Sequence, residues 1–205
     1  MQLKTTKGND FLSYNVQPLR TKSDIDDVLF VLRRTKYSKR NVFLFLFGIN
    51  VGLRASDIVC RKVKDISYSL TPKIVEKKTG KTQTLHLENL QPLIKTYIEE
   101  MNLTEEDYLF PSHVGNSHLT VNGLYRVFQN VGIQLERSDL ATHTMRKTFG
   151  YNYYMKTKDI GTLMIIFNHS SEKITKRYLG ITDQEIGESL ADFKLGFWIT
   201  VISIY

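Results

Sequence analysis

Apolar residues recur at helical spacing through most of the chain, beginning in the stretch "TKSDIDDVLFVLRRT". In this stretch Ser23 is expected to cap a helix whose first turn is acidic and whose end carries Arg33 and Arg34, as the helix dipole favours. The next helix is expected at about residues 39–49. It is apolar on nearly every face, so it is predicted to be the central buried helix and to end near Gly52.

The pattern changes between residues 59 and 88, where short β-leaning runs appear. The runs "VKDISYSL", "KIVEKK" and "TQTLHL" are predicted strands, and "TGK" is predicted as the hairpin turn between the last two. Helical spacing then returns, and further helices are expected at about residues 89–101, 120–131, 142–156, 159–167, 171–179 and 183–192. We therefore predict a mainly α domain with a small antiparallel β-sheet, in the α+β class. Its predicted limits are residues 20–192, between an N-terminal strap over 1–19 and an apolar C-terminal tail over 193–205.

Composition narrows the range of partners. A chain of 205 residues with 41% apolar and 11% aromatic residues is typical of one folded domain. The net charge of +7 favours a polyanionic partner, but it is a weak indicator because many soluble enzymes are also basic. Cys60 is the single cysteine, which excludes a disulfide framework and a thiolate metal cluster and fits a reducing cytosol. The longest apolar run, "VFLFLFGINVGL", is shorter than the ~20 residues that span a bilayer, so no membrane association is expected.

The stretch "FNHSSEKITKRYL" places a histidine nine residues before a tyrosine among several cations. On one unbroken helix His169 and Tyr178 would face opposite ways, because nine residues at roughly 100° each make two and a half turns. Either Ser170 or Ser171, however, can cap a helix that begins just after the histidine. His169 then lies in the approach to the helix, and Tyr178 near its far end can be turned back toward it.

Polar residues gather at three other places. Arg54 and Asp57 follow the buried helix, "EKKTGK" brings three lysines to the hairpin turn, and His143 and Arg146 lie one helical turn apart in "THTMRKTF". Each group alone is common in structures without any function, as a capped helix end, a solubilising turn or a solvated helix face. Only their combination points to a particular chemistry.

That chemistry is attack on a phosphodiester. Two arginines offer planar forks to the non-bridging phosphate oxygens. A tyrosine attacks phosphorus once its phenol, whose free pKa is about 10, loses its proton beside cations and a histidine. A hairpin lysine can protonate the leaving alkoxide, and fixed cations stabilise the transition state without a metal. The sequence contains no compact acidic cluster of the kind that holds two metal ions.

With these residues in place, the sequence resembles the tyrosine recombinases, or phage integrases, over about residues 20–192. "NVGLRASDI" is similar to the box of the first arginine, and "EKKTGKTQTLHL" is similar to the hairpin of the catalytic lysine. "YLFPS" resembles the loop before the next helix, "THTMRKTF" the HxxR box, and "LMIIFNHSSEKITKRYLGI" the segment of the last histidine and the nucleophile. Five boxes in the family's order are a specific signal.

The resemblance implies a role for each position. The two arginines would clamp the scissile phosphate, with Asp57 where the family has an acidic residue that supports the first arginine. The lysine would be the general acid, and the histidines would hydrogen-bond the phosphate and assist proton transfer. The tyrosine would form a 3′-phosphotyrosyl bond and release a 5′-hydroxyl, without metal, ATP or another cofactor. The implied catalytic set is Arg54, Lys78, His143, Arg146, His169 and Tyr178.

Two features of the boxes need interpretation. Lys78 is favoured as the general acid because Lys77 would point to the opposite face of the strand and Lys81 lies across the turn. Lys147 stands where the family commonly has histidine, and Asn168 where it commonly has glycine. Asparagine tolerates a left-handed backbone better than most residues, so it can replace glycine at a turn.

The resemblance also implies the partners: double-stranded DNA, and further copies of the chain in a homo-tetramer on paired DNA sites, in the cytoplasm at the nucleoid. Basic residues near the site are expected to contact phosphates, although a solvated helix face gives the same pattern; they are Lys81, Lys147, Lys173, Lys176 and Arg177. Two other functions stay open at this point, a DNA-binding regulator without turnover and a nicking and resealing enzyme like type IB topoisomerases. The complete catalytic set argues against the regulator, and the boxes favour recombination.

Overall fold

The computed structural model describes residues 16–181, 187, 190, 191 and 193. Its elements in chain order are α1 (Lys22–Leu32), α2 (Ser38–Val51), α3 (Ala55–Val59), α4 (Lys64–Ser67), β1 (Lys73–Val75), β2 (Thr82–Thr84), the 3₁₀-helix η2 (Glu88–Leu90), α5 (Gln91–Met101), α6 (Val121–Gln134), α7 (Thr144–Thr157), α8 (Ile160–Phe167) and α9 (Glu172–Leu179). The predicted class, mainly α with a small antiparallel sheet, is confirmed. Most of the helix predicted over 183–192, of the apolar tail and of the strap lies outside the described residues.

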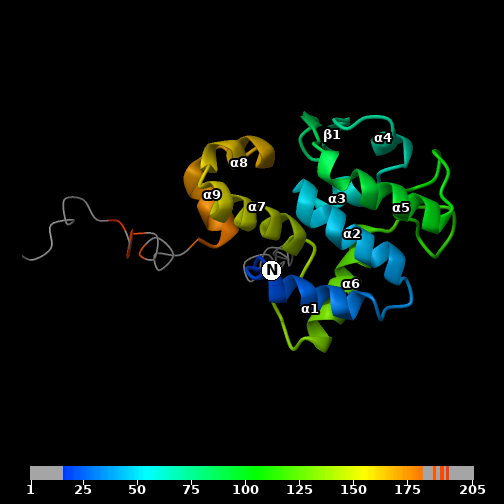
Figure 1. The fold of residues 1–205 in the computed structure, drawn as a ribbon, viewed down its shortest axis with the longest axis horizontal. Coiled ribbons are helices and arrows are strands. Elements are labelled where there is room, and N and C mark those ends of the chain that lie inside the picture. Colours follow the sequence, from blue (N-terminus) through cyan, green and yellow to red (C-terminus); the bar gives the residue numbers. More distant parts are fainter. Residues whose placement is uncertain (1–15, 182–186, 188–189, 192, 194–205) are drawn as a thin grey trace, which may run out of the picture.

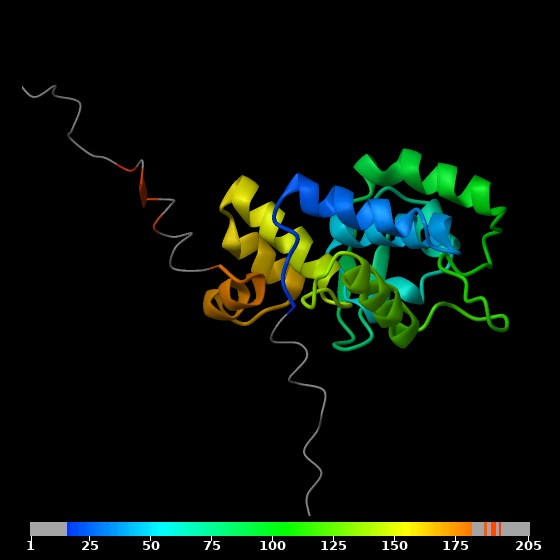
Figure 2. The same cartoon turned by 90° about the horizontal axis from the view of Figure 1, so that it is seen from below.

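Helix α2 lies at the centre of the domain, as its apolar sequence predicted. Figure 1 shows α1 and α6 on one side of it and α3 and α5 on the other, and Figure 2 shows α1 lying along it. Phe43 of α2 stacks on Tyr97 of α5 with ring centroids 3.9 Å apart, and Phe45 meets the edge of Phe128 of α6 at 6.4 Å. These aromatic contacts thus join α2 to α5 and to α6 in one main core.

A smaller apolar cluster lies where α7, α8 and α9 meet at one end of the domain (Figure 1). Its buried members are Leu163, Phe167 and Leu179, and Phe149 of α7 packs against them. The cluster holds α9, and therefore Tyr178, against the helix that carries the HxxR box. The catalytic set predicted from the sequence is divided between elements of the two clusters.

Two local predictions are wrong. Helix α1 is capped by Thr21, whose hydroxyl accepts the Asp24 N–H at 3.1 Å, and not by Ser23, which lies inside the helix. The run "VKDISYSL" forms the short helix α4 where a strand was expected. Its buried residues Val63 and Ile66 are three apart, the spacing of one helix face, whereas a strand would bury alternate residues.

Gly52 ends α2 with a left-handed backbone, φ +64°. A Cβ at this position would lie 2.4 Å from a ring carbon of Phe149 on α7. The residue therefore has two requirements, a positive φ and close approach to another helix, and only glycine meets both. The turn it makes leads the chain directly into Arg54.

We predict that Gly52→Ala lowers the free energy of unfolding by roughly 2–4 kcal/mol, the sum of the left-handed penalty and of overpacking against Phe149. The matched control is Gly115→Ala, because Gly115 has φ +65° and no atom within 4 Å of its would-be Cβ. The free energy of unfolding of Gly115→Ala should fall by only about 1–2 kcal/mol. Urea unfolding measures both; equal losses would contradict the packing part of this explanation.

Candidate active site

The first arginine of the site begins α3. Arg54 is the N-cap residue of α3, and its Nη1 lies 2.8 Å from Oε1 of the buried Glu76. This is ion-pair distance, but the two atoms do not have hydrogen-bond geometry. The sequence predicted Asp57 as the acidic partner. In the structure Glu76, from the start of the hairpin turn, takes that place.

Arg146 is buried in α7, where it is 2% exposed. Its Nη1 donates to the carbonyl of Gly52 at 2.7 Å, and its Nη2 donates to the carbonyl of Phe167 at 2.9 Å. The guanidinium also lies over the Phe167 ring, 4.3 Å from the centroid. It therefore connects the turn after α2 with the end of α8, which brings the boxes of the two arginines and the last histidine together.

The hairpin turn brings Lys78 to the site. Glu76 accepts the hydroxyl proton of Thr79 on its second oxygen at 2.6 Å, and the buried Asp57 accepts the backbone N–H of Lys77 at 2.8 Å. These bonds hold the turn against α3, so Asp57 supports the hairpin and not Arg54. Strand β1 ends at Val75, before the turn, and β2 begins at Thr82, after it, so strand alternation does not reach the lysines. Lys78 belongs to the turn and lines the cleft of the site.

The chain reverses between α8 and α9, which explains how His169 and Tyr178 can meet although they are nine residues apart. Asn168 has the left-handed backbone predicted for it, with φ +52°, and Ser171 caps α9 by accepting the Ile174 N–H. The rings of His169 and Tyr178 meet edge to face with centroids 5.3 Å apart. The two residues therefore share a site, as the capping argument predicted.

The histidines are held neutral by their surroundings. Burial, with Arg146 and Arg54 adding to it, lowers the pKa of His169 to about 4. Burial and Arg146 also lower the pKa of His143. A neutral imidazole can accept a proton, and Nδ1 of His143 lies 3.2 Å from the Tyr178 hydroxyl.

Tyr178 is half-buried, and burial raises its pKa to about 12, while Arg146 and Arg54 act in the opposite direction. The free protein therefore holds the phenol protonated at neutral pH. Its deprotonation needs an acceptor, and His143 is in place to be one.

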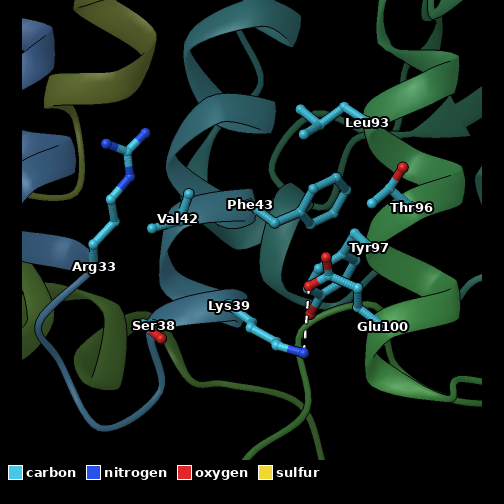
Figure 3. Close-up of a pocket in the computed structure, with 9 residues that line it drawn as sticks. All are labelled: Arg33, Ser38, Lys39, Val42, Phe43, Leu93, Thr96, Tyr97 and Glu100. Atoms are coloured by element: carbon cyan, nitrogen blue, oxygen red, sulfur yellow. Dashed lines mark ion pairs between the residues drawn. The ribbon is translucent and has the colours of Figure 1, made fainter.

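The side chains surround an open cleft of about 400 Å³. All six predicted catalytic residues line it, together with Thr79, Asn168, Ser170 and Ile174. A second hollow of about 260 Å³ lies between α2 and α5 (Figure 3). Its walls include Phe43 and Tyr97, an ion pair joins Lys39 and Glu100 across 3.4 Å at its edge, and none of the predicted catalytic residues reaches it. The predicted catalytic residues therefore share the first cleft and not the second.

The predicted phosphate-binding cations have different surroundings. Lys147 is 8% exposed, and its ammonium donates to the Val16 carbonyl, so the prediction that it faces DNA is wrong. Lys81 donates to the Asn168 side chain at 2.7 Å beside the cleft. Lys176 pairs with Glu172 along α9, while the two remaining cations, Lys173 and Arg177, are exposed on the same helix.

Sequence reasoning missed three residues of the site. Glu76 was quoted in the lysine box but given no role. Phe167 was counted only within a helix, yet its ring contacts Arg146, His169 and Tyr178. Thr175, fully buried on α9, bonds Nδ1 of His169 through its hydroxyl at 3.1 Å. The sequence could have identified Thr175 by its position four residues after the Ser171 cap, because this spacing places it on the same helix face as the cap, next to the histidine.

Comparison with solved structures identifies the fold. The XerH site-specific recombinase bound to its difH substrate matches with a TM-score of 0.63 and 20% identity, over 87% of this chain and 55% of that one. The catalytic domain of bacteriophage HP1 integrase matches with a TM-score of 0.59 and 20% identity, over 87% of this chain and 95% of that domain. The fold is thus that of a tyrosine recombinase catalytic domain.

Sequence comparison gives the family. The phage integrase family matches residues 20–185, and the probable integrase/recombinase YoeC of Bacillus subtilis (strain 168) is 40% identical over 169 residues, which are 82% of this chain and 91% of that protein. This chain belongs to the phage integrase family, as its boxes predicted. It spans only 55% of the length of the XerH recombinase.

We predict that His169 makes the protein less stable as the pH falls. Its pKa is about 4 in the folded protein and 6.5 in its ordinary state. Between these values the unfolded chain binds a proton that the folded protein does not, so this contribution is complete above pH 6.5 and is lost progressively toward pH 4.

His169→Gln should therefore lose less stability than wild type when urea unfolding is compared at pH 7.5 and pH 5. His86→Gln, which changes an exposed histidine outside this cleft, should behave as wild type. An unchanged pH dependence in His169→Gln would contradict the neutral state of this imidazole.

Proposed function

We propose that the chain is the catalytic domain of a tyrosine-type site-specific DNA recombinase, which cleaves and rejoins DNA through a 3′-phosphotyrosyl intermediate. The observation that carries this proposal is the convergence on one cleft of six side chains from four of the boxes. Family membership supports it, and neither the regulator nor the topoisomerase reading is favoured. A protein without turnover has no need for such a complete cleft.

In the proposed reaction the Tyr178 hydroxyl attacks the scissile phosphorus and passes its proton to Nδ1 of His143. The bond from the phenol oxygen to phosphorus forms as the bond from phosphorus to O5′ breaks. Lys78 donates a proton to that leaving oxygen. Arg54 and Arg146 stabilise the added negative charge of the transition state. Rejoining is the reverse, with a second 5′-hydroxyl as the nucleophile.

Double-stranded DNA is the proposed substrate. The net charge of +7 suits a polyanion, and the XerH recombinase and a Tn1549 transposon integrase were both solved in complex with DNA. We also propose a homo-tetramer on paired DNA sites, because strand exchange needs two cleaved duplexes, and a cytoplasmic location at the nucleoid. In the part of the chain that the structure describes, no helix is long and apolar enough to cross a membrane.

The nucleophile is tested by covalent trapping. Wild type and Tyr178→Phe are incubated in EDTA with a random-sequence pool of nicked duplexes, and adducts that survive SDS are selected. We expect adducts, enriched for one sequence, with wild type only, because phenylalanine lacks the attacking oxygen. Tyr154→Phe is the matched control and should form adducts, since Tyr154 packs in the apolar cluster away from the cleft. Adducts with Tyr178→Phe would assign the nucleophile elsewhere.

The general acid is tested with the leaving group. Lys78→Ala should cut the rate of cleavage of ordinary DNA by about 10²–10⁴-fold, because no proton reaches O5′. DNA with a 5′-thiolate leaving group should be cleaved at nearly the wild-type rate, since a thiolate leaves without a proton. Lys77→Ala is the control and should cleave both substrates. If Lys81→Ala shows the thiolate rescue and Lys78→Ala does not, Lys81 is the acid.

A further inference from the structure

The described end of the strap, residues 16–19, lies with Arg20 across the two helices that carry Arg146 and Tyr178. Figure 2 shows it running beside α7 and α9 before α1 begins. The Leu19 N–H donates to the buried Thr148 hydroxyl of α7 at 2.9 Å, and the Asn152 side chain donates to the Leu19 carbonyl at 3.1 Å. Val16 and Leu19 are themselves buried. The strap is thus fixed to α7 through its backbone as well as its side chains.

A second attachment joins the strap to the end of the nucleophile helix. Nη2 of Arg20 donates at 2.9 Å to the carbonyl of Gly180, two residues after Tyr178. Gly180 has φ +70°, and a Cβ there would lie 3.2 Å from the Gln17 side chain. The guanidinium of Arg20 also lies over the ring of Tyr151 on α7, 4.8 Å from the centroid. Arg20 therefore connects α7, α9 and the strap.

Lys147 makes the third attachment. Its ammonium donates to the Val16 carbonyl at 2.6 Å and lies 5.3 Å from the centroid of the Tyr178 ring. Burial lowers its pKa, and no carboxylate pairs with it among the described residues. A buried ammonium without a counter-ion costs stability, so its partners matter. Those partners are a strap carbonyl and the face of the nucleophile.

We propose that Lys147 and the strap form a brace that holds the Tyr178 ring in its attacking position, and so couple the N-terminal segment to cleavage. The inference rests on the proposed function, because it takes Tyr178 as the nucleophile. Lys147 is a positioning residue, since it contacts the tyrosine ring and does not line the cleft. Its charge over the ring also favours the phenolate that forms during attack.

The brace is tested in single-turnover cleavage of a suicide duplex that carries the sequence selected with wild type. Lys147→Met should cleave about tenfold more slowly, while its Kd for the same duplex stays within about twofold of wild type. Lys147→Arg should recover most of the rate, because a guanidinium can keep both the carbonyl bond and the ring contact. Lys156→Met makes the same chemical change at an exposed position of α7 and should cleave as wild type.

The pH profile separates positioning from general structural damage. In Lys147→Met the rise of the cleavage rate with pH should move to higher pH, because the phenolate loses a nearby cation. Damage alone would lower the rate equally at every pH. Arg20→Met removes the Gly180 bond without touching Lys147 and should also slow cleavage. If Lys147→Met unfolds, the cleavage rate of Arg20→Met tests the brace instead.

Wild-type cleavage rates in both Lys147→Met and Arg20→Met would overturn the brace and leave the recombinase function intact. The same holds if Lys147→Met unfolds and Arg20→Met cleaves as wild type. Absence of any adduct with wild type would instead overturn the proposed function, and the brace with it. The two failures are therefore distinguishable in one set of measurements.

Discussion

The structure depends on the buried guanidinium of Arg146. Its two hydrogen bonds reach the carbonyl of Gly52, in the turn before Arg54, and the carbonyl of Phe167, at the end of α8. A buried charge is tolerated only where it is fully bonded, and removing a partner of such a group commonly costs about 3–5 kcal/mol. The same group that would bind phosphate therefore fixes the main core, the second cluster and the turn of the last histidine relative to one another.

That arrangement concentrates positive charge, and the rest of the site compensates for it. Glu76 pairs with Arg54, and the nearby arginines and the Thr79 hydroxyl outweigh burial to keep the pKa of its carboxyl below the ordinary value. The histidines remain neutral because burial lowers the pKa of both imidazoles and the nearby arginines lower it further. A cationic cleft with neutral imidazoles suits a reaction in which a phenol must lose a proton while a phosphate gains charge.

Most of the fold and the six residues that share one cleft could be predicted from the sequence, because periodicity, caps and box order are local signals. The apolar run of α2 and the left-handed Asn168 are examples that the structure confirms. What failed depends on tertiary contacts. The partner of Arg54 could not be distinguished between Asp57 and Glu76 because both carboxylates lie in quoted boxes, and only the path of the hairpin decides between them. Lys147 was predicted to be a surface cation because nothing in the sequence shows that the chain near Val16 covers it.

Left-handed residues explain why such distant boxes meet with their side chains in one cleft. Gly52 precedes Arg54 by two residues, Gly80 follows Lys78 by two, Asn168 directly precedes His169, and Gly180 follows Tyr178 by two; all four have positive φ. Gly52, Asn168 and Gly180 end helices, and Gly80 lies in the hairpin turn, so each reverses the chain outside the regular packing of a helix or strand interior. His143 and Arg146 are the exception, at the start of α7, where Arg146 is held by buried hydrogen bonds to the other boxes. The site thus combines two helices, which carry Arg146 and Tyr178, with turns that place Arg54, Lys78 and His169. The hydrogen bonds of the buried Arg146 guanidinium hold the turns beside Arg54 and His169 in register.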